Sequence, residues 1–191
     1  MKIILASGSP RRREILDQIG ILYEVKPSNK EEVIKSTNPA EVVEELSHMK
    51  ANDIAKGEQE PCVVIGADTV VSSENKILGK PKDEEDAVCM IQNLCDRAHS
   101  VFTGVTIIKK ENGRQQIQSF CVETNVYVAK MTDEEIRAYV ATKEPMDKAG
   151  AYAIQGKFAP YIERIEGDYY NVVGFPISSI CRALKEMDVK Y

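Results

Sequence analysis

The sequence predicts an α/β protein with a mixed, elongated sheet flanked by helices. Short apolar strand-like segments alternate with helix-like segments through the first half of the chain, which is typical of α/β folds. Two long strand-like runs then flank an Asn-Gly pair, a strong signal for an antiparallel hairpin. With 191 residues and 43% hydrophobic content, the chain can bury a sizeable core. We therefore expect one domain over residues 1–191, which can take the form of two lobes around a central cleft.

The opening of the chain predicts a strand, a loop and a helix. Residues 2–6 form a short apolar run, and residues 10–19 follow as a helix with proline at its first position and Gly20 as its stop. The expected apolar face of this helix comprises Ile15, Leu16 and Ile19. A second strand is expected over residues 22–26, and the polar stretch 27–37 is expected to be a loop.

The central part of the chain predicts two helices on either side of the most apolar strand. Asn38 is a good N-cap for a helix with Pro39 in its first turn that runs to about residue 55. Residues 62–71 are rich in β-branched side chains, which indicates a buried strand, and residues 72–75 are turn-like. Asp83 can cap the next helix, which extends to about residue 94.

The second half predicts a long antiparallel ribbon followed by less regular structure. Two strands are expected over residues 98–129, joined by the hairpin turn at 111–114. A Thr-x-x-Glu capping box begins a helix over 132–142, after which the chain is irregular to about residue 150. Tyrosine-containing strand segments separated by two glycines are expected over 151–175, and a closing helix over 176–187.

Composition excludes several classes of function. Lys+Arg 25 against Asp+Glu 30 gives a net charge of -5, so a broad surface for duplex nucleic acid has little support. No apolar stretch is long enough to span a bilayer and the N-terminal one is too short for a signal peptide, so we expect a cytoplasmic protein without a membrane partner. Only His48 and His99 are present, which limits histidine-based catalysis, and the usual glycine motifs of ATP-driven motors and dinucleotide oxidoreductases are missing.

The segment Ser7-Gly8-Ser9-Pro10-Arg11-Arg12 predicts a phosphate-binding corner. With Ser9 as N-cap and Pro10 as the first helical residue, free backbone N–H groups face outward at the helix start and attract anions. Arg11 and Arg12 are unfavourable beside the positive end of the helix dipole unless an anion is bound. The alternative is that these arginines are solvated, because successive residues point about 100° apart around a helix.

Asp68 is the leading candidate for a catalytic proton acceptor. It follows the apolar run 63–67, and a carboxylate among such neighbours must form hydrogen bonds, coordinate a cation or shift its pKa. Thr69 adds a hydroxyl beside it. The alternative is an aspartate that only organises a turn, although apolar residues that continue the strand make a simple turn less convincing.

Two lysines and two glutamates extend this candidate site. Lys50 interrupts the apolar stripe of its helix, and Lys80 stands between a glycine and a proline that restrict the backbone. Together with the arginines they would form a cationic clamp for several phosphates, although a lysine at position 50 can also reach solvent. Glu31 and Glu32 offer oxygen ligands of the kind magnesium prefers, with simple solvation in the loop as the alternative.

Residues 147–156 combine small residues with an aromatic ring, a lysine and an amide. Small residues allow a ligand to approach the backbone closely, and the Gln155 amide can read a base or ribose edge.

Taken together, these segments resemble the Maf-like nucleotide pyrophosphatases, also called septum-formation proteins, in order and spacing over nearly the whole chain. The motifs that carry the resemblance are Ala6-Ser7-Gly8-Ser9-Pro10-Arg11-Arg12, Gly66-Ala67-Asp68-Thr69, Gly79-Lys80-Pro81 and Asp147-Lys148-Ala149-Gly150-Ala151-Tyr152. The resemblance implies a fold related to the inosine triphosphate pyrophosphatases, commonly as a homodimer. It also implies hydrolysis of a nucleoside triphosphate to the monophosphate and pyrophosphate with a divalent metal, Mg or Mn.

The same resemblance implies roles for individual residues. Water activated by Asp68, directly or through the metal, would attack the α-phosphorus, with metal held by Asp68 or by Glu31 or Glu32. The other residues implied for catalysis or substrate binding are Lys50, Lys80, Ser7, Ser9, Arg11, Arg12, Thr69 and Gln155. Residues 147–155 look like the subgroup that prefers dTTP and UTP, including modified pyrimidine nucleotides. The alternatives are the subgroup acting on methylated GTP, and a nucleotide-binding regulator of cell division with little catalysis.

Overall fold

The computed structural model describes residues 1–74 and 76–191, and its strands form one mixed seven-stranded sheet. The strands are β1 (Lys2–Leu5), β2 (Glu24–Val25), β3 (Cys62–Ser73), β4 (Lys76–Leu78), β5 (Arg97–Glu111), β6 (Arg114–Val128) and β7 (Ile162–Glu166). Their order is β2-β1-β3-β5-β6-β7, with β4 paired to β3. β1 is parallel to β2 and β3, and the other pairs are antiparallel, so the predicted mixed sheet is confirmed.

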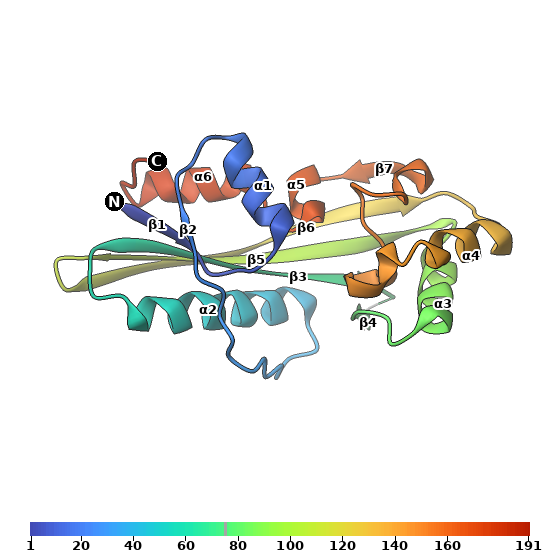
Figure 1. Ribbon diagram of the computed structural model, residues 1–191, viewed down its shortest axis with the longest axis horizontal. Helices are drawn as coiled ribbons and strands as arrows, with labels where there is room; N and C mark the ends of the chain where they lie inside the picture. Colours follow the sequence, from blue (N-terminus) through green and yellow to red (C-terminus); the bar gives the residue numbers. More distant parts are fainter. Residues whose placement is uncertain (75) are drawn as a thin grey trace.

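Helices cover both faces of this sheet and one of its ends (Figure 1). They are α1 (Pro10–Gln18), α2 (Pro39–Gly57), α3 (Glu84–Leu94), α4 (Asp133–Ala141), α5 (Tyr169–Val173) and α6 (Ile177–Glu186). α2 lies along one face of the long strands, α1 and α6 lie on the opposite face, and α3 and α4 sit together at the end distant from the chain termini. Alternate residues of β3 pack into the cores on the two faces, as expected for a strand that is buried on both sides.

Two glycines allow α2 to lie directly on the sheet. A Cβ atom at Gly66 of β3 would overlap the Ser47 carbonyl oxygen, and one at Gly104 of β5 would overlap the Val43 carbonyl oxygen. Both carbonyls belong to the backbone of α2, which cannot move aside as a flexible side chain can. The missing side chains therefore bring Lys50, one turn after Ser47, down onto β3.

The residues that were predicted to begin helices and to form the hairpin turn do so in the structure. The Asn38 side chain accepts from Ala40 N, and Thr132 with Glu135 forms the predicted capping box. Asn112 and Gly113 both have positive φ and close the two-residue turn between β5 and β6. These signals act within a few residues and do not depend on the tertiary fold.

The prediction of tyrosine-containing strands over 151–175 is largely wrong. Only β7 pairs with the sheet there, and residues 159–161 form a 3-10 helix. The Asp168 side chain accepts from Tyr170 N and starts α5, so the second half of this stretch is helical. Tyr152, Phe158 and Tyr161 do not line strands but pack, together with Tyr139 of α4, in the core beside that helix.

Three boundaries also differ from expectation. α1 ends at Gln18, and Ile19 is 43% exposed instead of lying on the apolar face, where Arg12 joins Ile15 and Leu16. The predicted strand over 22–26 reduces to the two residues of β2, which pair with the short β1. β3 extends through Ser73 and pairs with β4, so residues 72 and 73 belong to a strand instead of the turn predicted at 72–75, and residue 75 lies outside the described part.

β3, β5 and β6 contribute to the hydrophobic clusters at both ends of the molecule, and the assignment of the whole chain to one domain stays a prediction. Among the residues that the structure describes, no helix is both long and apolar enough to cross a bilayer.

Candidate active site

A pocket of about 390 Å³ opens where α1, β3 and α5 meet the segment 147–155, and we call it the central pocket. Its size lies within the range of small-molecule sites. Seven of the residues singled out in the sequence line it, although they are distributed over almost the whole chain: Ser9, Arg11, Arg12, Asp68, Thr69, Lys80 and Gln155. The fold therefore joins the predicted phosphate corner to the predicted base-reading segment. Four predicted site residues are not among those that line it: Ser7, Glu31, Glu32 and Lys50.

The phosphate corner has the predicted backbone geometry. Ser9 is the N-cap of α1 with extended φ and ψ, and Pro10 is the first helical residue. The Ser9 side chain makes no capping hydrogen bond within the described structure, so its hydroxyl is available at the pocket wall. Ser7 instead turns inward, and its Oγ accepts from Ser9 N at 3.3 Å. A substrate-binding role for Ser7 stays a prediction.

Arg12 is the most heavily bonded residue of the site. Its Nε donates to the Gly174 carbonyl at 2.9 Å, its Nη1 donates to Ser7 Oγ and the Ala67 carbonyl at 2.8 Å, and its Nη2 donates to Thr69 Oγ1 at 3.3 Å. Burial lowers the pKa of this guanidinium, and the nearby Asp68 carboxylate opposes the shift. Four of its five N–H groups are committed within the protein, so Arg12 chiefly fixes the pocket wall, and its contact with phosphate stays a prediction.

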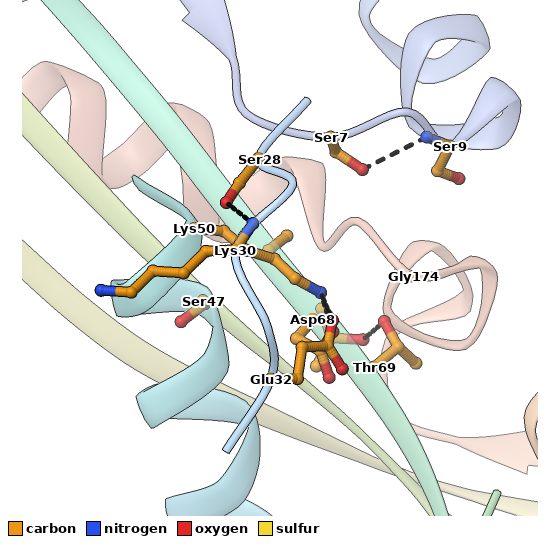
Figure 2. A network of polar contacts seen from close by, with 12 residues as sticks. Ser7, Ser9, Ser28, Lys30, Glu32, Ser47, Lys50, Asp68, Thr69 and Gly174 are labelled. Atoms are coloured by element: carbon orange, nitrogen blue, oxygen red, sulfur yellow. Dashed lines mark hydrogen bonds and ion pairs between the residues drawn. The ribbon is translucent and has the colours of Figure 1, made fainter. Parts of the chain in front are cut away.

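Asp68 faces α2 and forms an ion pair with Lys50 (Figure 2). Lys50 Nζ lies 2.5 Å from Asp68 Oδ1 and 2.8 Å from Glu32 Oε1. The Lys50 side chain is only 17% exposed, so the alternative in which this lysine reaches solvent is wrong. The close approach of α2 at Gly66 explains how a lysine on the apolar stripe meets a carboxylate on the adjacent strand.

Glu32, and not Glu31, reaches this ion pair from the loop that follows β2. The loop is held near α2 by Ser28, whose Oγ donates to Asp53 Oδ2 at 2.7 Å. Glu31 is exposed. The two carboxylates of Asp68 and Glu32 therefore converge on one cationic group, which places two oxygen donors of the kind that magnesium and manganese favour around a single point.

Two carboxylates are fewer than a cage built entirely from protein requires. No cluster of three or more His, Cys, Asp or Glu side chains suited to a metal occurs in the described residues. The donor set fits a cation that keeps waters and shares phosphate oxygens with a substrate, which is the usual arrangement for Mg²⁺.

The segment 147–155 forms another part of the lining of the central pocket. Gly150 N donates to the Gly79 carbonyl at 3.0 Å, which ties this segment to the backbone next to Lys80. Lys148 lines the pocket and pairs with Asp147, with Nζ and Oδ1 2.6 Å apart. The sequence indicated this segment but did not single out Lys148 as a site residue.

The contribution of α5 was not foreseen. Val172, Val173 and Gly174 line the central pocket, whereas the sequence predicted strand there. Gly174 ends α5 with φ 105, a conformation that glycine adopts without strain, and its carbonyl oxygen receives Arg12. The sequence did contain one signal for the end of this helix, the glycine of Asn-x-x-Gly, because glycine is a typical helix stop.

Tyr152 lines the pocket, and its ring and hydroxyl contact the buried His99. The two rings are edge to face with centroids 5.2 Å apart, and His99 Nε2 lies 2.7 Å from the Tyr152 hydroxyl. Burial lowers the pKa of His99 to about 4, and its Nδ1 has no partner within the described structure. His99 is thus a structural histidine that is neutral at pH 7.

This pKa predicts a loss of stability in mild acid. Between pH 6.5 and 4 the unfolded chain binds a proton at His99 that the folded protein does not, so the free energy of unfolding falls as the pH falls through this window. The loss should approach about 3 kcal/mol by pH 4. Urea titrations at several pH values should show it in the wild type, and His99→Gln should flatten the profile while His48→Gln should not. Superimposable profiles for wild type and His99→Gln would exclude this origin.

Comparison with known proteins decides the family. A family model described as "Maf-like protein" matches residues 2–187. The chain belongs to the Maf family. A relative from Lachnoclostridium phytofermentans named "dTTP/UTP pyrophosphatase" is 50% identical over 98% of this chain and 96% of its own. Proteins of the same name from Thermoanaerobacter sp. (50% identical, 100% of this chain and 99% of theirs) and Bacillus cereus (46% identical, 98% and 96%) are also similar.

A solved structure titled nucleoside-triphosphatase / dITP/XTP pyrophosphatase, from Mycobacterium abscessus, is 14% identical to this chain, with a TM-score of 0.48 over 98% of both chains.

Proposed function

We propose that this Maf protein hydrolyses dTTP and UTP, and related modified pyrimidine nucleotides, to the monophosphate and pyrophosphate. The observation that carries the proposal is that one pocket joins Asp68 and the Ser9 helix start to Lys80 and Gln155. Membership of the Maf family and the names of full-length relatives at about 50% identity support the same reaction and substrates.

We assign one part of the pocket to the phosphates of the substrate, the phosphate end, and another part to its base, the base end. At the phosphate end, the start of α1, Arg11 and Lys80 balance the charge of the triphosphate. At the base end, the segment that contains Gln155 offers an amide and apolar side chains to a pyrimidine ring. Asp68 lines the same pocket from β3, where a carboxylate can take a proton from the water that attacks the α-phosphorus.

Lys50 holds Asp68 in place through their ion pair. Its ammonium group is shared with Glu32, so both carboxylates are oriented toward one point beside the central pocket. A divalent cation, Mg or Mn, would be held there by Asp68 and Glu32 and would supply neutralisation of phosphate charge. The Lys50 ammonium group, held beside the pocket by Asp68, would balance part of the charge of the triphosphate.

A product assay over a panel of nucleotides tests the proposal. The purified protein is incubated with MgCl₂ or MnCl₂ and UTP, dTTP, CTP, the purine triphosphates or methylated GTP, and pyrophosphate and orthophosphate are measured separately. We expect pyrophosphate from UTP and dTTP in preference to the other nucleotides, and dependence on the added metal. Orthophosphate as the first product would contradict the reaction.

The same panel separates the two alternatives. Preference for methylated GTP would indicate the other substrate subgroup, with the same chemistry at Asp68. Tight binding of UTP without turnover would support a nucleotide-binding regulator of cell division. The family resemblance also supports a cytoplasmic homodimer, and sedimentation of the purified protein measures its oligomeric state.

A further inference from the structure

Two threonines are paired across the sheet directly behind the central pocket. Thr69 of β3 and Thr103 of β5 are register partners, and their hydroxyl oxygens are 3.0 Å apart. Thr69 lines the pocket and is partly exposed, whereas Thr103 is fully buried and does not reach it. Any effect of Thr103 on a bound substrate is therefore indirect, and Thr69 is the side chain that connects it to the pocket.

Donors and acceptors around this pair fix the direction of its hydrogen bonds. Thr103 Oγ1 lies 2.9 Å from the Asn171 carbonyl oxygen, which can only accept, so the single hydroxyl proton of Thr103 points toward α5. The contact between the two hydroxyls then requires Thr69 to donate to Thr103. Arg12 Nη2 donates to Thr69 Oγ1 at 3.3 Å, which agrees with this direction. The resulting series of hydrogen bonds runs from Arg12 through Thr69 and Thr103 to the Asn171 carbonyl oxygen. Both threonine hydroxyl protons are therefore donated to acceptors within the protein.

Asn171, at the end of this series of hydrogen bonds, is itself held in place by several contacts. Asn171 is fully buried, and its Nδ2 donates to the Val101 carbonyl at 3.0 Å and to Thr124 Oγ1 at 2.9 Å. Its carbonyl oxygen also accepts from Gly174 N at 2.9 Å, which closes the end of α5. The acceptor that orients Thr103 is therefore fixed by contacts on both sides of the residue.

We propose that Thr103 fixes Thr69 as a hydrogen-bond acceptor toward the pocket and thereby selects bases that present a ring N–H. With its proton committed, Thr69 cannot donate to a phosphate oxygen, and its remaining lone pair requires a donor on the ligand. Uracil and thymine share an N3–H donor, whereas N3 of cytosine is an acceptor. Thr103 is thus a positioning residue for base selection. This inference rests on the proposed function, because it assumes a pyrimidine in the central pocket.

The Thr103→Val variant tests this role, with Thr103→Ser as the matched control. Valine keeps the shape of threonine but removes the acceptor, so Thr69 regains a proton that it can donate to cytosine N3. We expect the ratio of kcat/KM for UTP to that for CTP to fall about tenfold in Thr103→Val and to stay unchanged in Thr103→Ser. A folded Thr103→Val protein with the wild-type ratio, or with equal losses for both nucleotides, would overturn the proposal, since a purely structural defect affects both substrates alike.

A second measurement uses the unmodified protein and so does not depend on folding of a variant. UTP methylated at N3 lacks the donor, and we expect its kcat/KM to fall at least tenfold relative to UTP, with a smaller loss for 3′-deoxy-UTP. Equal turnover of UTP and its N3-methyl derivative would overturn the assignment. So would a loss confined to 3′-deoxy-UTP, because Thr69 would then accept from the sugar. Absence of any UTP hydrolysis would instead refute the proposed function.

Discussion

Replacing Asp68 with asparagine is expected to lower kcat for UTP hydrolysis by about 10² to 10⁴, the usual contribution of a positioned general base. Asparagine has the size of aspartate and can still accept from Lys50 Nζ, which now lies 2.5 Å from Asp68 Oδ1. The substitution therefore removes the basic oxygen and its charge while it preserves packing. Steady-state kinetics with MgCl₂, together with an unfolding curve, measures the effect.

Asp133→Asn is the matched control for this substitution. Asp133 is a carboxylate in the first turn of α4, it does not line the central pocket, and its Oδ1 accepts from Gln92 Nε2 at 3.1 Å. Its replacement should leave kcat within about twofold of wild type, as is usual for surface substitutions. Near-normal turnover by a properly folded Asp68→Asn protein would show that this carboxylate is not the base.

Gly104→Ala is expected to destabilise the fold by about 3 kcal/mol, the upper range for overpacking. The added Cβ would overlap the Val43 carbonyl, and α2 would have to move away from the sheet. Because α2 carries Lys50, the same displacement should separate that lysine from Asp68 and reduce kcat in the fraction that still folds. Urea unfolding measures the stability, and kinetics at low temperature measures the turnover.

Gly57→Ala, on α2 itself, provides the comparison for Gly104→Ala on β5. Gly57 is the last residue of α2, and a Cβ there would meet nothing within 4 Å. This substitution should be neutral or slightly stabilising, because alanine loses less backbone entropy than glycine. Equal stability of the two variants would mean that the helix and the sheet are not held in contact at Gly104.

Features that depend on neighbouring residues in the chain were accessible from the sequence. Pro10 after Ser9 specified the start of α1, and Asn112-Gly113 specified the turn between β5 and β6, because each acts through its own backbone. The apolar run over 62–71 correctly indicated the central strand that carries Asp68.

Features that depend on tertiary packing were not accessible. Periodicity placed three consecutive arginines around α1, but only the fold shows that Arg12 points inward, where acceptors from β3 and α5 receive it. The tyrosine-rich stretch after residue 150 has strand-like composition, yet Tyr152, Phe158 and Tyr161 pack into the core beside α4. The Thr69–Thr103 pair likewise depends on a register between strands that are distant in the sequence.

Hydrolysis in water enriched in ¹⁸O tests the reaction at the central pocket most directly. The proposed role of Asp68 places the attacking water at the α-phosphorus, so one ¹⁸O atom should appear in the nucleoside monophosphate and none in the pyrophosphate. Mass spectrometry of both products after a single turnover of UTP gives the answer. Label in the pyrophosphate would place the attack at the β-phosphorus and would contradict the proposed reaction.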